Sequence, residues 1–224
     1  GDPFVGVSYE KIKKPFYFNY LENSFLKRCD FISVPFKNMV QFFNKNYDNK
    51  FIVIPQGFDF SEVNIQGNYS KNEIPTFIYS GTIMPGLRDP LSLINYLEKS
   101  KRKFKFIIYT KQKSPFLIFE NLLGTSLIIK DYVARNELLM VLSRADFLVN
   151  VNTDSNDNEG INAIPSKLID YTFSERPILS YSQNNLDIKT ILEFLDGEYG
   201  RAFKVEKFED YQIESVAQKF INLT

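Results

Sequence analysis

The sequence predicts an α/β protein with a doubly wound, Rossmann-like parallel sheet. Runs of β-branched and aromatic residues alternate along the chain with amphipathic stretches of helical length. The strand-like runs, such as TFIYS (76–80) and FLVNVN (147–152), are apolar throughout. An unbroken apolar run is typical of a strand in a parallel sheet with helices on both faces. In a strand with one face exposed to solvent, apolar and polar residues alternate.

Residues 76–224 repeat this alternation and are expected to form one complete α/β domain. The expected strands are 76–80, 104–110, 126–133, 147–152, 177–181 and 202–205. The expected helices are 91–100, 114–123, 135–145, 165–175, 186–196 and 208–223. Asp89 and Pro90 favour the start of the first helix, while Gly124 and Gly197 favour the ends of the second and the fifth.

Residues 1–55 show the same pattern in a shorter form. The expected elements are a helix at 15–28, a strand at 30–35, a helix at 36–46 and a strand at 50–55. Two such units cannot bury both faces of a sheet. We therefore expect residues 1–55 to be the end of a preceding α/β domain, or an appendage packed on the second domain. Residues 56–75, rich in Gly, Asn, Ser and Gln, are expected to connect the two.

The composition excludes several kinds of partner and chemistry. Lys and Arg number 27 and Asp and Glu number 27, so no net charge attracts nucleic acid, and no nucleic-acid partner is expected. The chain has no histidine, which rules out Ser-His-Asp and Cys-His nucleophiles, histidine bases and imidazole metal ligands. The chemistry must use carboxylates, Lys, Arg, hydroxyls, backbone amides or the substrate itself.

The sequence also gives an expectation for the cellular compartment of the protein. No apolar run reaches about 18 residues, and the single Cys29 cannot form an internal disulfide. We therefore expect a cytoplasmic protein, although a secreted protein without disulfides fits equally well. The segment 11–20, KIKKPFYFNY, mixes basic and aromatic residues and predicts peripheral contact with the inner face of a membrane. A solvated helix start with core aromatics explains this segment equally well.

The first candidate site is the loop after strand 76–80, because ligands of open α/β sheets bind beyond the carboxyl ends of the strands. Gly81 lets backbone N–H groups approach an anion, and the next helix adds the positive end of its dipole. Arg88 supplies a cation suited to bidentate phosphate contact. The alternative is an ordinary glycine turn with a solvated arginine. Lys111, just past strand 104–110, is a further candidate for phosphate contact.

The second candidate site is the start of helix 165–175. Ser166 and Asp170 are four residues apart and share a face, while Lys167 and the first-turn amides point toward the strand ends. This arrangement can hold a diphosphate at the helix start and a ribose diol one turn deeper. The alternative is that Asp170 is exposed or pairs locally with Lys167.

The third candidate is the acidic loop 153–160, which contains Asp154, Asp157 and Glu159. Acidic residues with this spacing can indicate a metal, but the loop lacks the distal glutamate of a calcium-binding loop. A solvated loop is favoured, and no metal site is expected.

Four segments of the chain, in this order, resemble the retaining GT-B glycosyltransferases (glycosyl transferases group 1, family 4-like). They are CDFISVPFKNMVQFF with KFIVIPQGFDF, FIYSGTIMPGLRDPLSLINYL, IIKDYVARNELLMVLSRADFLVNV, and PSKLIDYTFSERPIL. The resemblance covers roughly residues 22–182. It implies the C-terminal, donor-binding half of a GT-B architecture, preceded by the end of the acceptor-side domain.

The resemblance also implies a role for each candidate residue. Arg88 and Lys167 would be catalytic, since they would neutralise the diphosphate leaving group. The other donor contacts would come from the amides of Gly81 and Thr82 and from Lys111 at the diphosphate, Tyr132 and Val133 at the base, Ser166 and Asp170 at the helix start, and Glu159 and Asn162 at the sugar. Asn162 stands where the family has the first of two glutamates, and Gly81-Thr82 replaces its Gly-Arg pair.

The activity implied by the resemblance is transfer of a sugar, with a hexose and retention of configuration expected. The donor would be a nucleotide diphosphate sugar and the acceptor a saccharide or a lipid-linked molecule, in bacterial surface polysaccharide or glycoconjugate biosynthesis. No cofactor besides that substrate is expected. The alternative is a non-catalytic, transferase-like nucleotide-binding or scaffold module, and a nucleotide-sugar epimerase ranks last because such enzymes use histidine. With an incomplete first domain, the chain is expected to bind nucleotide without turnover.

Overall fold

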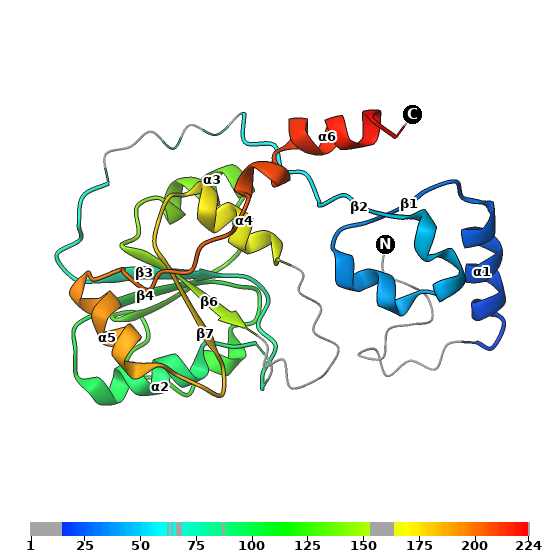
Figure 1. Ribbon diagram of the computed structural model, residues 1–224. Helices are drawn as coiled ribbons and strands as arrows, with labels where there is room; N and C mark the ends of the chain where they lie inside the picture. The colour runs from blue at the N-terminus through cyan, green and yellow to red at the C-terminus, as the bar shows by residue number, and fades with distance from the viewer. Residues whose placement is uncertain are drawn as a thin grey trace. The chain divides into compact units, whose positions relative to one another are not determined.

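The computed structural model describes residues 15–61, 63, 65, 69–86, 88–152 and 164–223 (Figure 1). The chain divides into two compact units. One contains the described residues of 1–59 and 209–224, and the other contains the described parts of 60–157 and 164–208. The expected domain boundaries at residues 55 and 75 remain predictions.

The larger unit is built on a five-stranded sheet in which all neighbouring strands are parallel. Its strands are β3 (Thr76–Ser80), β4 (Lys105–Tyr109), β5 (Leu127–Lys130), β6 (Phe147–Asn152) and β7 (Ile178–Ser182). They lie in the order β5-β4-β3-β6-β7. The predicted fold class, a doubly wound parallel α/β sheet, is confirmed.

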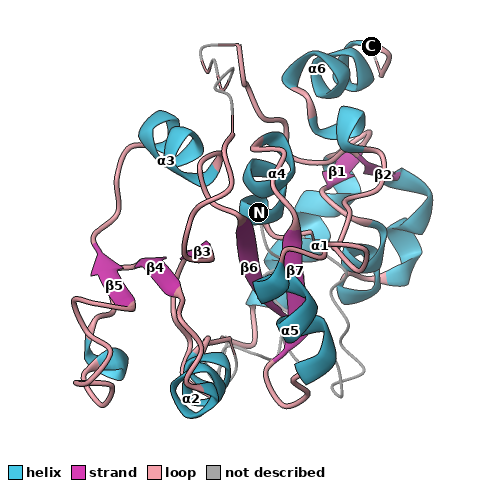
Figure 2. Cartoon of the chain, turned by 90° about the vertical axis from the view of Figure 1, so that its left-hand side faces the viewer, coloured by secondary structure: helices cyan, strands magenta, loops and turns pink. Residues whose placement is uncertain are grey.

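Helices cover both faces of this sheet, as Figure 2 shows. The pair α2 (Leu91–Ser100) and α5 (Ile188–Asp196) lies on one face, and the pair α3 (Arg135–Leu142) and α4 (Ser166–Phe173) lies on the other. The core between the sheet and α2 and α5 is rich in rings. Phe77 lies at its centre, with ring centroids 4.5 Å from Phe147 and 4.6 Å from Phe106. Helices on both faces bury successive side chains of the central strands, which explains why β3 and β6 are apolar along most of their length.

Three expected elements within residues 76–224 differ in type from prediction. The segment 114–123 forms only a 3₁₀ helix, Ser114–Phe116, followed by turns, because Phe116 and Phe119 are buried three residues apart while Leu117 and Ile118 are exposed. The expected strand 202–205 is a single antiparallel bridge between Phe203 and Ile178.

The third difference is in the expected helix 208–223. A short 3₁₀ helix, Phe208–Tyr211, is followed by α6 (Ile213–Ile221), and Gln212 between them is extended. The Gln212 backbone forms a parallel bridge with Phe58, so a tertiary contact interrupts the helix that local pattern alone would continue.

The smaller unit contains α1 (Phe18–Arg28) and a two-stranded parallel sheet of β1 (Ile32–Val34) and β2 (Phe51–Val53). The segment between the strands, expected to hold one helix, forms two 3₁₀ helices, Lys37–Phe42 and Lys45–Lys50. Lys50, the last residue of the second of these helices, donates from its ammonium group to the carbonyls of Leu26, Lys27 and Cys29 at 2.7–3.2 Å and so caps the end of α1.

Residues 11–14 of the segment 11–20, for which membrane contact was considered, lie outside the described residues. In its described part Phe16 and Tyr20 are 94% and 73% exposed. Among the described residues, no helix is both long enough and apolar enough to cross a bilayer. Peripheral membrane contact therefore stays a prediction.

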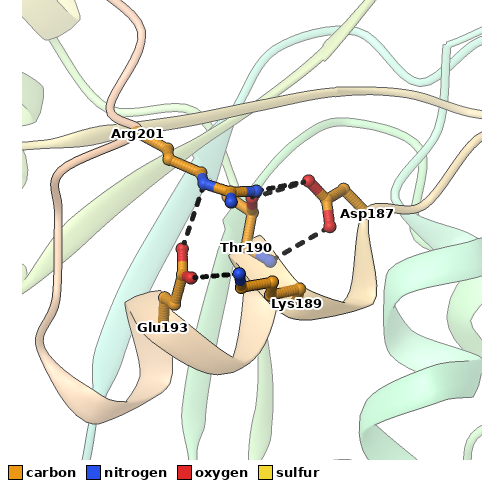
Figure 3. Close-up of polar contacts among 5 residues, drawn as sticks. All are labelled: Asp187, Lys189, Thr190, Glu193 and Arg201. Atoms are coloured by element: carbon orange, nitrogen blue, oxygen red, sulfur yellow. Dashed lines mark hydrogen bonds and ion pairs between the residues drawn. The ribbon is translucent and has the colours of Figure 1, made fainter.

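Helix α5 begins two residues after the expected start at Leu186 and ends before Gly197, as expected (Figure 3). Asp187 accepts hydrogen bonds from the amide and the hydroxyl of Thr190 at 3.2 and 2.7 Å, and these bonds lower the pKa of its carboxyl. Arg201 contacts both Asp187 and Glu193, at 3.2 and 3.5 Å. Gly197 ends the helix with a φ of 87°, a conformation that favours glycine.

A buried carboxylate joins the segment before β3 to the sheet. Asp146, 2% exposed, precedes β6 and accepts hydrogen bonds from the Tyr69 hydroxyl, the Asn72 backbone and side-chain amides, and the Thr76 backbone amide, at 2.5–3.1 Å. Thus a single side chain satisfies donors from the connecting segment and from the first residue of β3.

Replacing this carboxylate should destabilise the larger unit. Asp146→Ala leaves several buried donors unpaired, so we expect the free energy of unfolding to fall by about 3 kcal/mol. Chemical denaturation measures the change. The matched control is Asp131→Ala, whose side chain is 75% exposed and pairs with Lys113, and which should cost less than about 1 kcal/mol. Equal losses for the two variants would contradict the role given to Asp146.

Candidate functional site

The strand order places a ligand-binding position between β3 and β6. From β3 the chain adds β4 and β5 on one side, while β6 and β7 lie on the other side. Where the winding direction reverses, the loops at the carboxyl ends of the two central strands diverge and leave a crevice. The glycine loop after β3 and the start of α4 lie at this end of the sheet, so the two main candidate segments come together.

The glycine loop turns sharply at Gly81, whose φ of 141° favours glycine. The Gly81 amide donates to the carbonyl of Tyr109 at 3.1 Å, so it is not available to a ligand, contrary to the role expected from the resemblance. The Thr82 amide has no partner among the described residues. Of the two expected amide donors, only Thr82 can therefore serve an anion.

Arg88 is held by a tight backbone turn. Its amide and carbonyl both bond to Met84, at 2.8 and 3.0 Å. The next residue, Asp89, is 1% exposed and accepts from the amides of Gly86 and Leu91 and from the side chain of Gln183, at 2.7–3.0 Å. The sequence indicated Asp89 only as a helix start. In the structure α2 begins at Leu91, as expected, and Asp89 also fixes the loop that carries Arg88.

One buried hydrogen bond sets the position of α4 relative to β3. The Ser80 amide, at the end of β3, donates to the Tyr171 hydroxyl at 2.8 Å, and Tyr171 is fully buried. Burial is the main cause that raises the Tyr171 pKa to about 12, so the hydroxyl stays neutral. This bond brings the first turn of α4 beside the glycine loop.

Lys167 projects from that first turn toward Gly81. A Cβ added at Gly81 would lie 3.9 Å from Lys167 Cδ, and Lys167 Nζ lies 4.5 Å from the ring centroid of Tyr79. Nζ is buried and has no hydrogen-bond partner among the described residues. Burial, and secondarily the charge of Arg88, lower the Lys167 pKa from its usual 10.5 to about 7. Lys167 and Arg88 thus lie near enough for their charges to interact, and neither forms an ion pair with a described residue.

The residues expected near the base lie on the exposed side of this loop. Tyr132 is 43% exposed, and its hydroxyl lies 3.4 Å from that of Thr82. Lys111 Nζ lies 5.6 Å from the Tyr132 ring centroid. Val133 is half-buried next to Tyr132. The structure thus groups Thr82, Lys111 and Tyr132, although they come from three different loops.

Asp170 lies one turn deeper in α4, but its partner is not the one that local spacing offered. Arg135 Nε and Nη2 donate to Asp170 Oδ1 at 3.0 and 2.8 Å, and Lys167 does not contact it. Sequence reasoning missed Arg135, because the two residues are far apart in the chain and only the packing of α3 beside α4 joins them. Ser166, the first residue of α4, is exposed.

The remaining candidates lie outside the described residues. These are Glu159 and Asn162, expected at the sugar, and the acidic loop 153–160. Within the described ranges no group of three Asp, Glu or Cys side chains could hold a metal ion.

No protein-family model and no curated protein sequence matches the chain. Solved structures match it in fold. A TarM variant from S. aureus, in complex with fondaparinux, alpha-GlcNAc-glycerol and UDP, aligns over 98% of this chain with a TM-score of 0.61 and 14% identity. A glycosyltransferase from Rickettsia africae aligns over 95% with a TM-score of 0.67 and 12% identity. Sucrose-phosphate synthase from Thermosynechococcus elongatus aligns over 97% with a TM-score of 0.62 and 12% identity.

These proteins are GT-B glycosyltransferases, and the likeness supports the predicted Rossmann-like half of a GT-B architecture. At such low identity it concerns the fold alone. The chain spans 49% of the TarM chain, 67% of the Rickettsia chain and 63% of the synthase chain.

Burial of a charged Lys167 should lower the free energy of unfolding of the protein without a ligand. Below about pH 7 the folded and unfolded states both carry its proton, and the full cost of burying the charge is present. As pH rises from 7 toward 10.5, the folded state loses the proton first and the cost disappears. Lys167→Met should therefore raise the melting temperature by several degrees at pH 6, and by less at pH 9.

The control for this comparison is Lys99→Met, which changes an exposed lysine of α2. Its effect on the melting temperature should be small and the same at both pH values. A Lys167→Met protein that melts below the wild type at pH 6 would contradict the burial argument.

Proposed function

We propose that the larger unit is the donor-binding domain of a glycosyltransferase, and that it binds a nucleotide diphosphate sugar at the glycine loop. One observation carries the proposal: the Lys167 amine is buried beside Gly81 without a hydrogen-bond partner among the described residues, and the charge of Arg88 acts on it. A positive charge on Lys167 is costly there, and a bound diphosphate would offset the charges of both side chains. The similarity in fold to known glycosyltransferases supports the same reading.

The catalytic contribution of this site would be electrostatic. During transfer, the bond between the anomeric carbon and the diphosphate oxygen breaks, and negative charge grows on the leaving diphosphate. Lys167 and Arg88 would stabilise that charge, helped by the Thr82 amide and the positive end of α4. Lys167 is held in place before the substrate arrives, so little reorganisation is needed when the charge develops.

The finer assignments rest on the resemblance and on analogy. We propose a hexose donor, retention of configuration, and a saccharide or lipid-linked acceptor, and we place the nucleotide base near Tyr132 and Val133. TarM was solved with UDP, which makes uridine diphosphate a natural first probe. A non-catalytic nucleotide-binding module remains the second candidate, and nucleotide binding without turnover in a protein with both GT-B halves would favour it.

The first test is binding of UDP and GDP, measured by calorimetry. Arg88→Ala removes a charge-assisted contact to the diphosphate, so affinity for whichever nucleotide binds should fall about ten- to a hundredfold. The control is Arg102→Ala, which removes a surface arginine paired with Asp196 and should leave affinity unchanged. Affinity unaltered by Arg88→Ala would oppose the proposed site.

The second test is the pH dependence of binding. A bound diphosphate would raise the Lys167 pKa from about 7, so binding should take up a proton and affinity should fall as pH rises from 7 to 9. The loss should approach, but not exceed, about tenfold per pH unit. In Lys167→Met this slope should vanish. A slope that is the same in both proteins would show that Lys167 does not contact the diphosphate.

A further inference from the structure

The strongest feature outside the diphosphate contacts is the pairing of Asp170 with Arg135. Arginine usually meets a carboxylate with two donors on two oxygens. Here Nε and Nη2 both donate to Oδ1, at 3.0 and 2.8 Å. Oδ2 accepts no hydrogen bond from the described residues, and the Asp170 side chain is 15% exposed. The two oxygens of one carboxylate are therefore not equivalent.

The guanidinium of Arg135 is fixed by aromatic packing. Its Cζ lies 4.8 Å from the ring centroid of Phe60, and Phe60 stacks on Phe173 with centroids 3.9 Å apart. Phe173 is three residues after Asp170, on the same side of α4. The guanidinium thus contacts α4 in two ways. It pairs directly with Asp170, and it packs on Phe60, which stacks on Phe173; these two contacts restrict its orientation.

Arg135 favours the ionised form of the partly buried Asp170 carboxyl. Burial raises the pKa of the Asp170 carboxyl, and the hydrogen bonds and charge of Arg135 oppose that rise. Arg135, from α3, is the charged group that faces Asp170 across the packed elements, and Tyr171 is its neighbour on α4. Without Arg135, burial would act alone and favour the protonated, neutral form.

We propose that Arg135 is a positioning residue for the nucleotide ribose: it occupies Asp170 Oδ1 and presents Oδ2 to a single ribose hydroxyl. This inference rests on the proposed function, since it assigns Asp170 to the ribose of the same nucleotide. A lone carboxylate can accept both hydroxyls of a diol, one on each oxygen. With Oδ1 already engaged twice, one hydroxyl is bound strongly and the other weakly.

The test compares UDP with its 2′-deoxy and 3′-deoxy analogues by calorimetry, using GDP and its analogues if GDP binds more tightly. In the wild type one analogue should bind within about threefold of the parent, and the other should lose about tenfold or more. In Arg135→Met the two analogues should lose affinity equally, because both oxygens are then open. Similar losses for both analogues in the wild type would overturn the proposal.

A pH series separates positioning from a merely structural role. Arg135→Met should bind the parent nucleotide progressively more weakly between pH 7 and pH 5, as Asp170 becomes protonated, whereas the wild type and Asp170→Asn should not show this added slope. Arg135→Lys keeps the charge but not the two donors, so it should restore the pH profile without the difference between analogues. A folded Arg135→Met protein with wild-type affinity, pH profile and analogue ratio would refute the inference.

One measurement does not depend on nucleotide. Titration of the Asp170 carboxyl by NMR should give a higher pKa in Arg135→Met than in the wild type, and an unchanged pKa would disprove the pairing itself. If the wild type binds neither UDP nor GDP, the proposed function fails, and the ribose role fails with it. If it binds nucleotide but the Arg135 variants behave as the wild type does, only the inference fails.

Discussion

The hydrogen bond between the Ser80 amide and the Tyr171 hydroxyl is the contact on which the candidate site depends. It joins the last residue of β3 to the middle of α4, in a fully buried environment. Ser80 still pairs with Tyr109 of β4 but lies beyond the residues of β3 that pair with β6, and without Tyr171 its amide would be an unpaired buried donor. Because the bond fixes α4 against the end of β3, the side chains on the first turns of α4 reach the glycine loop at a defined position.

The site brings together Arg88 and Lys167, and neither pairs with a carboxylate among the residues that the structure describes. Asp89 is buried close by, but its oxygens are used by the amides of Gly86 and Leu91 and by Gln183. It fixes the loop rather than pairing with Arg88 or Lys167. Asp170 is likewise engaged, by Arg135. These two described carboxylates thus have local partners other than Arg88 and Lys167. A site in which a buried lysine lowers stability while it serves ligand binding is consistent with this arrangement.

Much of the fold was predictable because the signals were local and consistent. The strands β3 and β6 and the helix α2 occur where their apolar runs and turn residues indicated. Prediction failed where non-local contacts decided the conformation. The Gln212 backbone pairs with Phe58 and interrupts a helix. The segment 202–205 forms only one bridge, between Phe203 and Ile178 of the edge strand β7.

For the site, the sequence by itself determined which residue types are present and where they stand in their local elements. These are a glycine after a strand, Arg88, and a helix start with Lys167 and Asp170, and the chain has no histidine. These features depend on residue type and on spacing within one loop or one helical turn. Only the tertiary structure decided that the Gly81 amide is used by Tyr109, that the Lys167 amine is buried without a partner, and that Arg135 engages one oxygen of Asp170. The reason is physical: burial, desolvation and pairing are properties of packed neighbours that are remote in the chain, and local pattern does not contain them.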